Sequence, residues 1–263
     1  MLSISLGFSM SRIVSVANQK GGVGKTTTAV NMGASLAAAE KTVLVVDLDP
    51  QANATSGLGV GGAEITASSY EVLIGAVPAD AAIVPTSLDF LDVLPASRDL
   101  AGAEIELVDA ENREWRLREA LLPIRERYEY IIIDCPPSLG ILTLNALCAA
   151  DAVVVPLQCE YYALEGLSRL LDTIGILRER LNPSLEIDGI LLTMYDSRNN
   201  LSEQVAREVR QNFDGRVFET IIPRNVRLSE SPSFGKPALL YDVKSKGTQR
   251  YLEFAREYLE IGH

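Results

Sequence analysis

Uninterrupted apolar runs, separated by helical patterns, constrain the fold of this 263-residue chain more than any other feature. Most runs are rich in Val, Ile and Leu without polar alternation, as in 42–49 (TVLVVDLD) and 130–137 (YIIIDCPP). Strands of this kind are buried on both faces, which is typical of a parallel sheet between two layers of helices. Further runs lie at 12–18, 88–95, 152–157, 187–195 and 217–223.

Helical patterns lie between these runs and predict how the chain is organised. They cover 26–40, 114–128, 164–181, 201–213 and 248–261. Because strands and helices alternate, we predict an α/β fold with a doubly wound, mostly parallel sheet and helices on both faces. The length and the 47% apolar composition suit one domain, which we place at 12–263 after a short N-terminal extension at 1–11. Ligands of such folds bind at the carboxyl ends of the strands.

Composition narrows the classes of function. Cys135, Cys148 and Cys159 lack the spacing of a metal or redox site, which favours reduced thiols. The single histidine is His263, which argues against histidine acid–base chemistry. The first ten residues lack the basic start and long apolar core of a signal peptide, and Met10 is an alternative start. No run reaches the roughly 20 apolar residues of a membrane span, so we expect a soluble, cytoplasmic protein.

A glycine-rich loop, GGVGKTT at 21–27, links the first predicted strand to the first predicted helix. Glycines let backbone N–H groups wrap a phosphate, and the start of the helix adds its positive dipole end. In this pattern Lys25 reaches the β- and γ-phosphates of a nucleotide, and the Thr26 hydroxyl binds Mg²⁺. The loop therefore predicts a site for a nucleoside triphosphate.

Three aspartates end apolar runs at the same predicted edge of the sheet. Asp47 and Asp49 alternate along one strand, so both turn to the same side. Asp134 follows a run of apolar residues, which is a Walker B pattern whose carboxylate acts on Mg²⁺. Phosphoryl transfer depends mainly on positioning and charge neutralisation, so it needs no histidine.

The loop departs from the template G-x-x-x-x-G-K-[ST], because Gln19 stands at the first glycine position and Lys20-Gly21-Gly22 follows. This arrangement resembles the deviant Walker A box of the ParA/MinD family of P-loop ATPases. The resemblance extends over about 12–261, and within the family the sequence is similar to the chromosome-partitioning ParA (Soj) subgroup. It is carried by the stretches 46–59, 134–147, 155–174, 191–205 and 221–242.

The resemblance implies a cycle driven by ATP and Mg²⁺. ATP closes two subunits into a homodimer around two nucleotides, and a ParB-type partner stimulates hydrolysis to ADP and phosphate. Lys20 then reaches the partner subunit's nucleotide, and Gly21 has to stay small at this dimer interface. Asp49 positions the attacking water, and Asp47 assists the metal shell that Thr26 and Asp134 form. The implied catalytic set is Lys20, Lys25, Asp49 and Asp134, and the implied ATP contacts are Lys20, Gly21, Gly22, Val23, Gly24, Lys25, Thr26, Thr27, Pro223 and Asn225.

The same resemblance implies that the closed dimer binds double-stranded DNA without sequence preference and is associated with the nucleoid. The net charge of −11 argues against DNA binding by the whole surface. The segment 195–263 holds 11 Lys and Arg against 10 Asp and Glu, so the acidic excess lies in 1–194. The positions that match the family's DNA contacts are Arg198 and Arg227, with Lys244, Lys246 and Arg250 as further candidates.

Other readings remain open at this stage. A related ATPase could position another cargo on the nucleoid, and it would share both the enzyme and the DNA face. A MinD-like membrane ATPase would need a basic amphipathic C-terminal helix, whereas the tail at 251–263 carries three glutamates and one arginine. An iron protein of the nitrogenase type would need cluster cysteines at matching positions, whereas here Cys135 follows the Walker B aspartate without a suitable partner cysteine. A module that binds nucleotide without hydrolysing it would leave the three aspartates and Lys20 unexplained.

Overall fold

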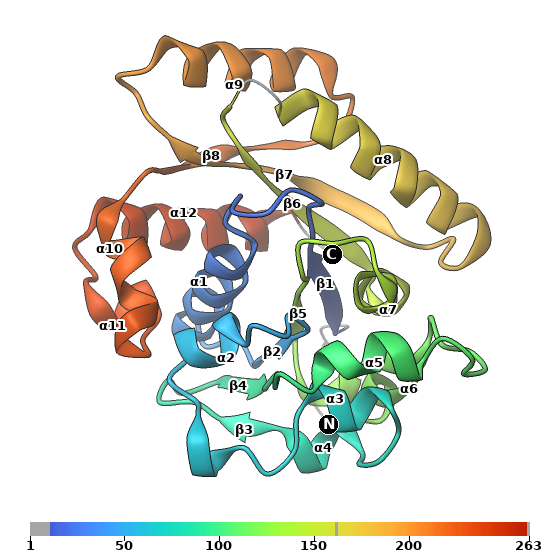
Figure 1. The fold of residues 1–263 in the computed structure, drawn as a ribbon. Coiled ribbons are helices and arrows are strands. Elements are labelled where there is room, and N and C mark those ends of the chain that lie inside the picture. Colours follow the sequence, from blue (N-terminus) through green and yellow to red (C-terminus); the bar gives the residue numbers. More distant parts are fainter. Residues whose placement is uncertain (1–10, 161–162, 262–263) are drawn as a thin grey trace, which may run out of the picture.

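The computed structural model describes residues 11–160 and 163–261, so His263 and residues 1–10 of the expected N-terminal extension lie outside it. The described chain forms one sheet of eight strands in the order β3-β4-β2-β5-β1-β6-β7-β8 (Figure 1). Seven strands run parallel, and β3 pairs antiparallel with β4 at one edge. The predicted fold class is therefore confirmed. The strands are β1 Arg12–Val16, β2 Val43–Asp47, β3 Val84–Pro85, β4 Leu91–Leu94, β5 Tyr130–Asp134, β6 Ala152–Gln158, β7 Glu186–Tyr195 and β8 Val217–Pro223.

Helices cover both faces of the sheet (Figure 1). On one face lie α1, α12 and the short α10 and α11, and on the other lie α5, α6, α7 and α8. The longer helices are α1 Lys25–Ala38, α7 Ile141–Ala149, α8 Ala163–Arg180, α9 Asn200–Asn212 and α12 Lys246–Glu260. The shorter α-helices are α2 Asn53–Gly57, α3 Ser69–Leu73, α4 Ala79–Ala82, α5 Leu100–Glu106, α6 Arg116–Leu121, α10 Val226–Glu230 and α11 Ala238–Tyr241. Three 3₁₀ turns, η1 Gly62–Glu64, η2 Leu122–Arg127 and η3 Ser231–Phe234, join some of them.

Two separate hydrophobic cores explain why the strands show no polar alternation. Successive residues of a strand point to opposite faces. In β5, Ile131 and Ile133 pack in the core beneath α5–α8, whereas Ile132 between them packs beneath α1 and α12. The interiors of the central strands β2, β5 and β6 are therefore apolar on both faces, and their polar residues lie at the strand ends.

Three local expectations need correction. The predicted helix at 114–128 is helical only as α6, and it tightens into the 3₁₀ turn η2, which has Pro123 in its first turn. Proline has no N–H to donate to the preceding turn, which accounts for the break in the α-helical hydrogen bonding. The helix α7 was missed because its sequence is apolar around most of its circumference and shows little helical periodicity. The edge strand β3 was missed because it has only two residues.

The short helices α2, α3, α4, α5, α10 and α11 were not predicted either. The state of the cysteines agrees with expectation. Cys135, Cys148 and Cys159 are all buried and free. Across the described ranges, no helix combines the length and apolar character needed to cross a membrane.

Candidate nucleotide-binding site

The glycine-rich loop joins β1 to α1, as the sequence predicts. Gly22 and Gly24 adopt φ values of 73° and 91°, a left-handed conformation that side chains disfavour. Gly24 ends the loop as the N-cap of α1. Val23 is buried, and its carbonyl accepts a hydrogen bond of 2.8 Å from the Thr193 hydroxyl at the end of β7. The loop is thereby attached to β7, which lies two strands away from β1 in the sheet, and it leads directly into the 14-residue helix α1.

The two lysines of the loop have different surroundings. Lys25 is buried, and its ammonium group donates a 3.1 Å hydrogen bond to the carbonyl of Lys20. Burial lowers the pKa of Lys25, an effect that Asp134 and Asp49 oppose. The ammonium group of Lys20 lies instead at the surface, 3.0 Å from a carboxylate oxygen of Glu160. Lys25 is thus within reach of the charges of Asp134 and Asp49, whereas Lys20 pairs with Glu160 just beyond the end of β6.

Asp47 and Asp134 are paired neighbours at the ends of β2 and β5. Asp47 accepts three hydrogen bonds, from the Thr55 amide at 2.8 Å, the Thr55 hydroxyl at 2.7 Å and the Asp49 amide at 3.1 Å. Burial raises the pKa of Asp47 to about 6, although the Thr55 hydrogen bonds oppose the shift. Asp49 is also buried, and it accepts a 2.9 Å bond from the Gln51 amide. Asp47 therefore holds the loop that carries Asp49, a role that the sequence did not reveal.

Asp134 is different, because both of its carboxylate oxygens are buried without a hydrogen-bond partner of ordinary geometry among the described residues. Burial, and then the neighbouring Asp47, raise the pKa of Asp134 well above its usual range, while Thr26 and Lys25 oppose the shift. Buried polar groups are almost always paired, and an unpaired carboxylate is costly. A hard divalent cation between Asp134 and Thr26 would satisfy this group, since Mg²⁺ prefers oxygen ligands. The residues present therefore fit a magnesium ion.

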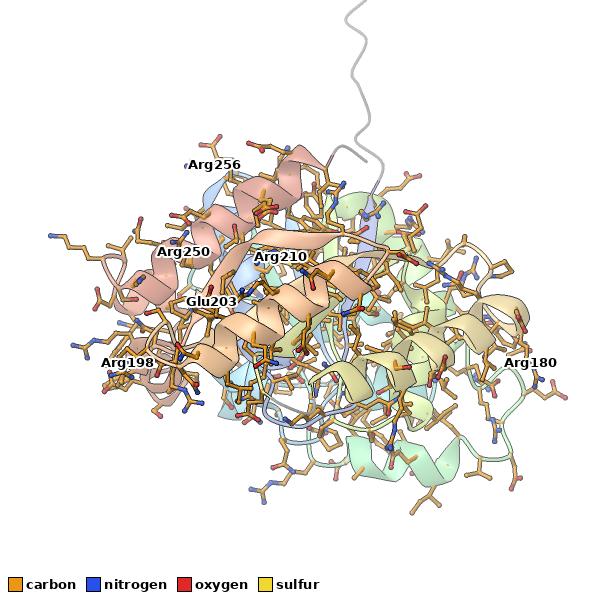
Figure 2. The ribbon with its side chains drawn as sticks, turned by 90° about the horizontal axis from the view of Figure 1, so that it is seen from above. Arg180, Arg198, Glu203, Arg210, Arg250 and Arg256 are labelled. Carbon is orange, nitrogen blue, oxygen red and sulfur yellow. The ribbon has the colours of Figure 1, made fainter. Side chains whose placement is uncertain are left out.

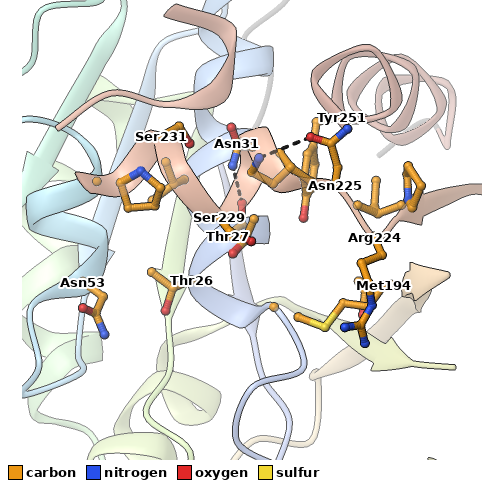
Figure 3. Close-up of a pocket in the computed structure, with 18 of the residues that line it drawn as sticks. Thr26, Thr27, Asn31, Asn53, Met194, Arg224, Asn225, Ser229, Ser231 and Tyr251 are labelled. Atoms are coloured by element: carbon orange, nitrogen blue, oxygen red, sulfur yellow. Dashed lines mark hydrogen bonds between the residues drawn. The ribbon is translucent and has the colours of Figure 1, made fainter. Parts of the chain in front are cut away.

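A cavity of about 480 Å³ opens beside the loop and has the size of a small-molecule site (Figure 3). Thr26 and Thr27 line one part of it, and Pro223 and Asn225 line another. Asn225 also caps α10, where its side chain accepts from the amides of Arg227 and Leu228. The structure thus brings the two predicted adenine-end residues, far apart from the loop in sequence, into the same cavity as the phosphate loop.

Several further residues line this cavity that sequence reasoning did not select. Met194 has φ 51° at the end of β7, and Arg224 follows β8. Asn31 donates to the Thr27 carbonyl at 2.8 Å and accepts from the Ala238 amide at 2.8 Å, so it joins α1 to α11. The place of Met194 at a strand end is a signal that could have indicated it. For Asn31, inside a helix, the sequence carries no such signal.

Gly21 lies exposed at the outer side of the loop. A Cβ atom added there would meet only the Cβ of Pro137, at an ordinary contact distance of 3.7 Å. The chain itself therefore leaves room for a side chain at this position. If Gly21 has to remain small, the reason lies outside this subunit.

The predicted DNA-contacting residues lie in the C-terminal part of the molecule, around α9, α10 and α12 (Figure 2). Each of the three arginines is paired with an acidic side chain. Arg198 binds Asp196 with two bonds of 2.8 and 2.9 Å and lowers the pKa of Asp196 to about 2. Arg227 lies 2.8 Å from Glu230 and 3.4 Å from Asp242. Arg250 pairs with Glu253, and Lys244 and Lys246 are exposed.

The fold and this site define a P-loop nucleotide-binding protein. Comparison with known proteins narrows the class, since the family described as AAA domain matches residues 11–187. The chain is 60% identical to the chromosome partitioning protein ParA of Myxococcus xanthus, over 95% of this chain and 88% of that protein. It is 56% identical to the sporulation initiation inhibitor protein Soj of Bacillus subtilis, over 96% of this chain and 100% of that protein.

A solved structure adds to this picture. Cobyrinic acid a,c-diamide synthase from Mycobacterium smegmatis, with bound ADP and magnesium, superposes with a TM-score of 0.84 and 43% identity, covering 95% of each chain. The synthase name belongs to the mycobacterial protein, and the likeness concerns its fold in the nucleotide-bound state. The family match, the sequence relatives and the solved structure together show that the chain belongs to the ParA/MinD family of P-loop ATPases. Within that family it belongs to the chromosome-partitioning ParA (Soj) subgroup.

Proposed function

We propose that the protein is a DNA-partitioning ATPase that uses Mg²⁺ and ATP to form a DNA-binding dimer. The observation that carries the proposal is the unpaired, buried carboxylate of Asp134 beside the phosphate loop. A site with that residue, a buried lysine and a glycine-capped helix is suited to bind and cleave a phosphate anhydride. The relative from Myxococcus xanthus, which is named a chromosome partitioning protein, supplies the biological setting.

In this proposal the chain's own residues divide the work at the phosphates. Thr26 and Asp134 would hold the metal, with Asp47 assisting its shell, and the metal would neutralise charge on the phosphate oxygens. Lys25 exchanges the carbonyl of Lys20 for the β- and γ-phosphates. Asp49 positions the attacking water, and Asp47 keeps the Asp49 loop in place through its hydrogen bonds to Thr55 and to the Asp49 amide. Pro223 and Asn225 contact the adenine end.

Dimerisation completes the site in this proposal. Lys20 and Gly21 form part of the interface, and Lys20 reaches the partner subunit's nucleotide as the positive group that stabilises the transition state. The closed dimer then doubles the number of basic side chains that face DNA. Those contacts are salt-sensitive and independent of sequence, because they are made to phosphates. A ParB-type partner stimulates hydrolysis and releases the dimer from DNA.

The C-terminal helix supports the choice of DNA over a lipid surface. The apolar face of α12, with Tyr251, Phe254, Ala255 and Tyr258, is buried against the sheet. Glu257 on the same helix accepts hydrogen bonds from the Glu219 and Thr220 amides. The helix therefore has no free apolar face for membrane insertion, as a MinD-like anchor would require.

The test is the ATPase rate with and without double-stranded DNA and the N-terminal peptide of the ParB-type partner. We expect a low rate alone and a strong stimulation when both are present. In Lys20→Ala we expect nucleotide binding to persist and the stimulation to disappear. Full stimulation in Lys20→Ala would contradict the role across the dimer, and no ATPase activity under any condition would contradict the proposal as a whole.

A further inference from the structure

The surface lysine of the phosphate loop is held by an acidic residue of its own subunit. The ammonium group of Lys20 lies 3.0 Å from Glu160, and the two side chains are 40% and 47% exposed. The other carboxylate oxygen of Glu160 accepts a hydrogen bond from Gln158, the last residue of β6. Glu160 is thus fixed relative to the sheet, and its pairing with Lys20 is a defined arrangement of the single chain.

The backbone of Lys20 is fixed as well. Its amide donates to the side-chain oxygen of Asn18 at 3.0 Å, and the Asn18 side chain donates to the Pro156 carbonyl in β6 at 2.8 Å. Its carbonyl accepts the 3.1 Å bond from Lys25. One residue therefore engages both functional lysines, because the Lys20 carbonyl holds Lys25 and the Lys20 side chain is held by Glu160.

We propose that Glu160 is a positioning residue that keeps Lys20 on its own subunit until a second, nucleotide-loaded subunit competes for it. This inference rests on the proposed role of Lys20 across the dimer interface. Two events release Lys20. Nucleotide in the same subunit draws Lys25 away from the Lys20 carbonyl, and the phosphates of the partner's nucleotide compete with the Glu160 carboxylate for the Lys20 ammonium group.

The strength of the contact suits this use. Ion pairs between half-exposed side chains are weak, so phosphates with several negative charges can displace the carboxylate. The ion pair must break twice in each dimer, once per subunit. The factor by which one pair raises the dimer dissociation constant is therefore squared. Glu160 raises the threshold for dimerisation without preventing it.

The experiment measures dimerisation in Mg²⁺ and a non-hydrolysable ATP analogue by sedimentation velocity. In Glu160→Gln we expect the dimer dissociation constant to fall by roughly threefold to tenfold. The matched control is Glu203→Gln, which removes one charge from an exposed pair with Arg207 on α9 and should leave the constant unchanged. The difference in dissociation constant between wild type and Glu160→Gln should shrink as salt is raised from about 0.1 M to about 1 M, because the screening length falls from about 10 Å to about 3 Å.

A second comparison separates the ion pair from a general charge effect. Glu160→Gln should change nothing when it is combined with Lys20→Ala, because the group that Glu160 holds is then absent. Equal or weaker dimerisation of Glu160→Gln than of wild type, or an equal gain without Lys20, would overturn the inference. If the wild-type chain itself stays monomeric with the analogue, the proposed dimeric function fails, and that result is distinct from the other two.

Discussion

Two regions of the molecule carry charged residues in opposite surroundings. One is the edge of the sheet where the parallel strands end, and the other is the C-terminal basic surface formed by Arg198, Arg227, Lys244, Lys246 and Arg250. At the sheet edge, both carboxylate oxygens of Asp134 are buried without a hydrogen bond of ordinary geometry from a described residue, and Lys25 is buried against a carbonyl. On the C-terminal surface, Arg198 and Arg227 are exposed, and each already has an acidic partner. Buried unpaired charge indicates a ligand that must complete the site. Exposed paired charge indicates a surface where any ligand has to compete.

This difference predicts unequal effects of mutation, the largest at the phosphate loop. In Lys25→Ala we expect ATP turnover to fall about 1,000-fold, because the buried site loses the positive group aimed at the phosphates. Steady-state phosphate release, with tryptophan or circular-dichroism spectra to verify folding, measures the loss. A rate within a few-fold of wild type would remove the contrast between the two regions.

The second effect concerns the outer side of the same loop. In Gly21→Val we expect ATP-dependent dimerisation to weaken by about 100-fold, while nucleotide still binds. The chain has room for a side chain at Gly21, so the clash arises only with a partner. The control is Gly61→Val, at an exposed glycine with extended backbone and nothing within 4 Å of an added Cβ. Equal dimerisation of the two variants would show that no partner approaches Gly21.

The third effect tests the basic surface. In Arg198→Glu combined with Arg227→Glu we expect DNA affinity to fall about 30-fold at low salt, with dimerisation unchanged. The charge reversal would remove two proposed phosphate contacts per subunit, and it leaves Asp196, Glu230 and Asp242 without their arginine partners. Fluorescence anisotropy on labelled duplex DNA of unrelated sequences measures it. Unchanged affinity at moderate salt would move the DNA site elsewhere on the molecule.

The smallest effect is a change in stability, and it exposes the cost of the unpaired carboxylate of Asp134. In Asp134→Asn we expect the free energy of unfolding at neutral pH to rise by about 1–3 kcal/mol, while ATPase activity is lost. The folded-state pKa of Asp134 lies above its unfolded value, so wild-type stability increases as pH falls through that pKa and is lowest above it. Urea unfolding across pH should show a shallower slope for the variant, with the remainder due to Asp47, whose pKa is about 6. A variant less stable than wild type at neutral pH would contradict the argument.

The sequence predicted the sheet well because burial on both faces leaves a direct record. Ile131, Ile132 and Ile133 could be assigned to a parallel strand without knowing which core each one enters. The phosphate loop was equally visible, since Gly22 and Gly24 are required by backbone conformation. Lengths of elements were less certain where proline or uniform apolar sequence obscured the period, as at Pro123 and in α7.

The site was predicted only where its residues follow strands or belong to the loop. The sequence around Asp47 does not show that the amide and hydroxyl of Thr55 donate hydrogen bonds to its carboxylate. That contact depends on how α2 packs back against the end of the sheet. The pairing of Lys20 with Glu160 joins residues 140 positions apart, and it becomes visible only when β1 and β6 lie side by side. Contacts between distant segments are set by topology and leave no local pattern.

The nucleotide cavity is assembled from two separate stretches of the chain, and this arrangement has an evolutionary consequence. The segment that matches the AAA domain family, 11–187, contains the phosphate loop and all three aspartates. The opposite wall of the cavity, from Thr193 to Tyr251, follows it in the chain. Mutations in the later stretch can therefore reshape this wall of the cavity while the phosphate loop and the three aspartates stay unchanged.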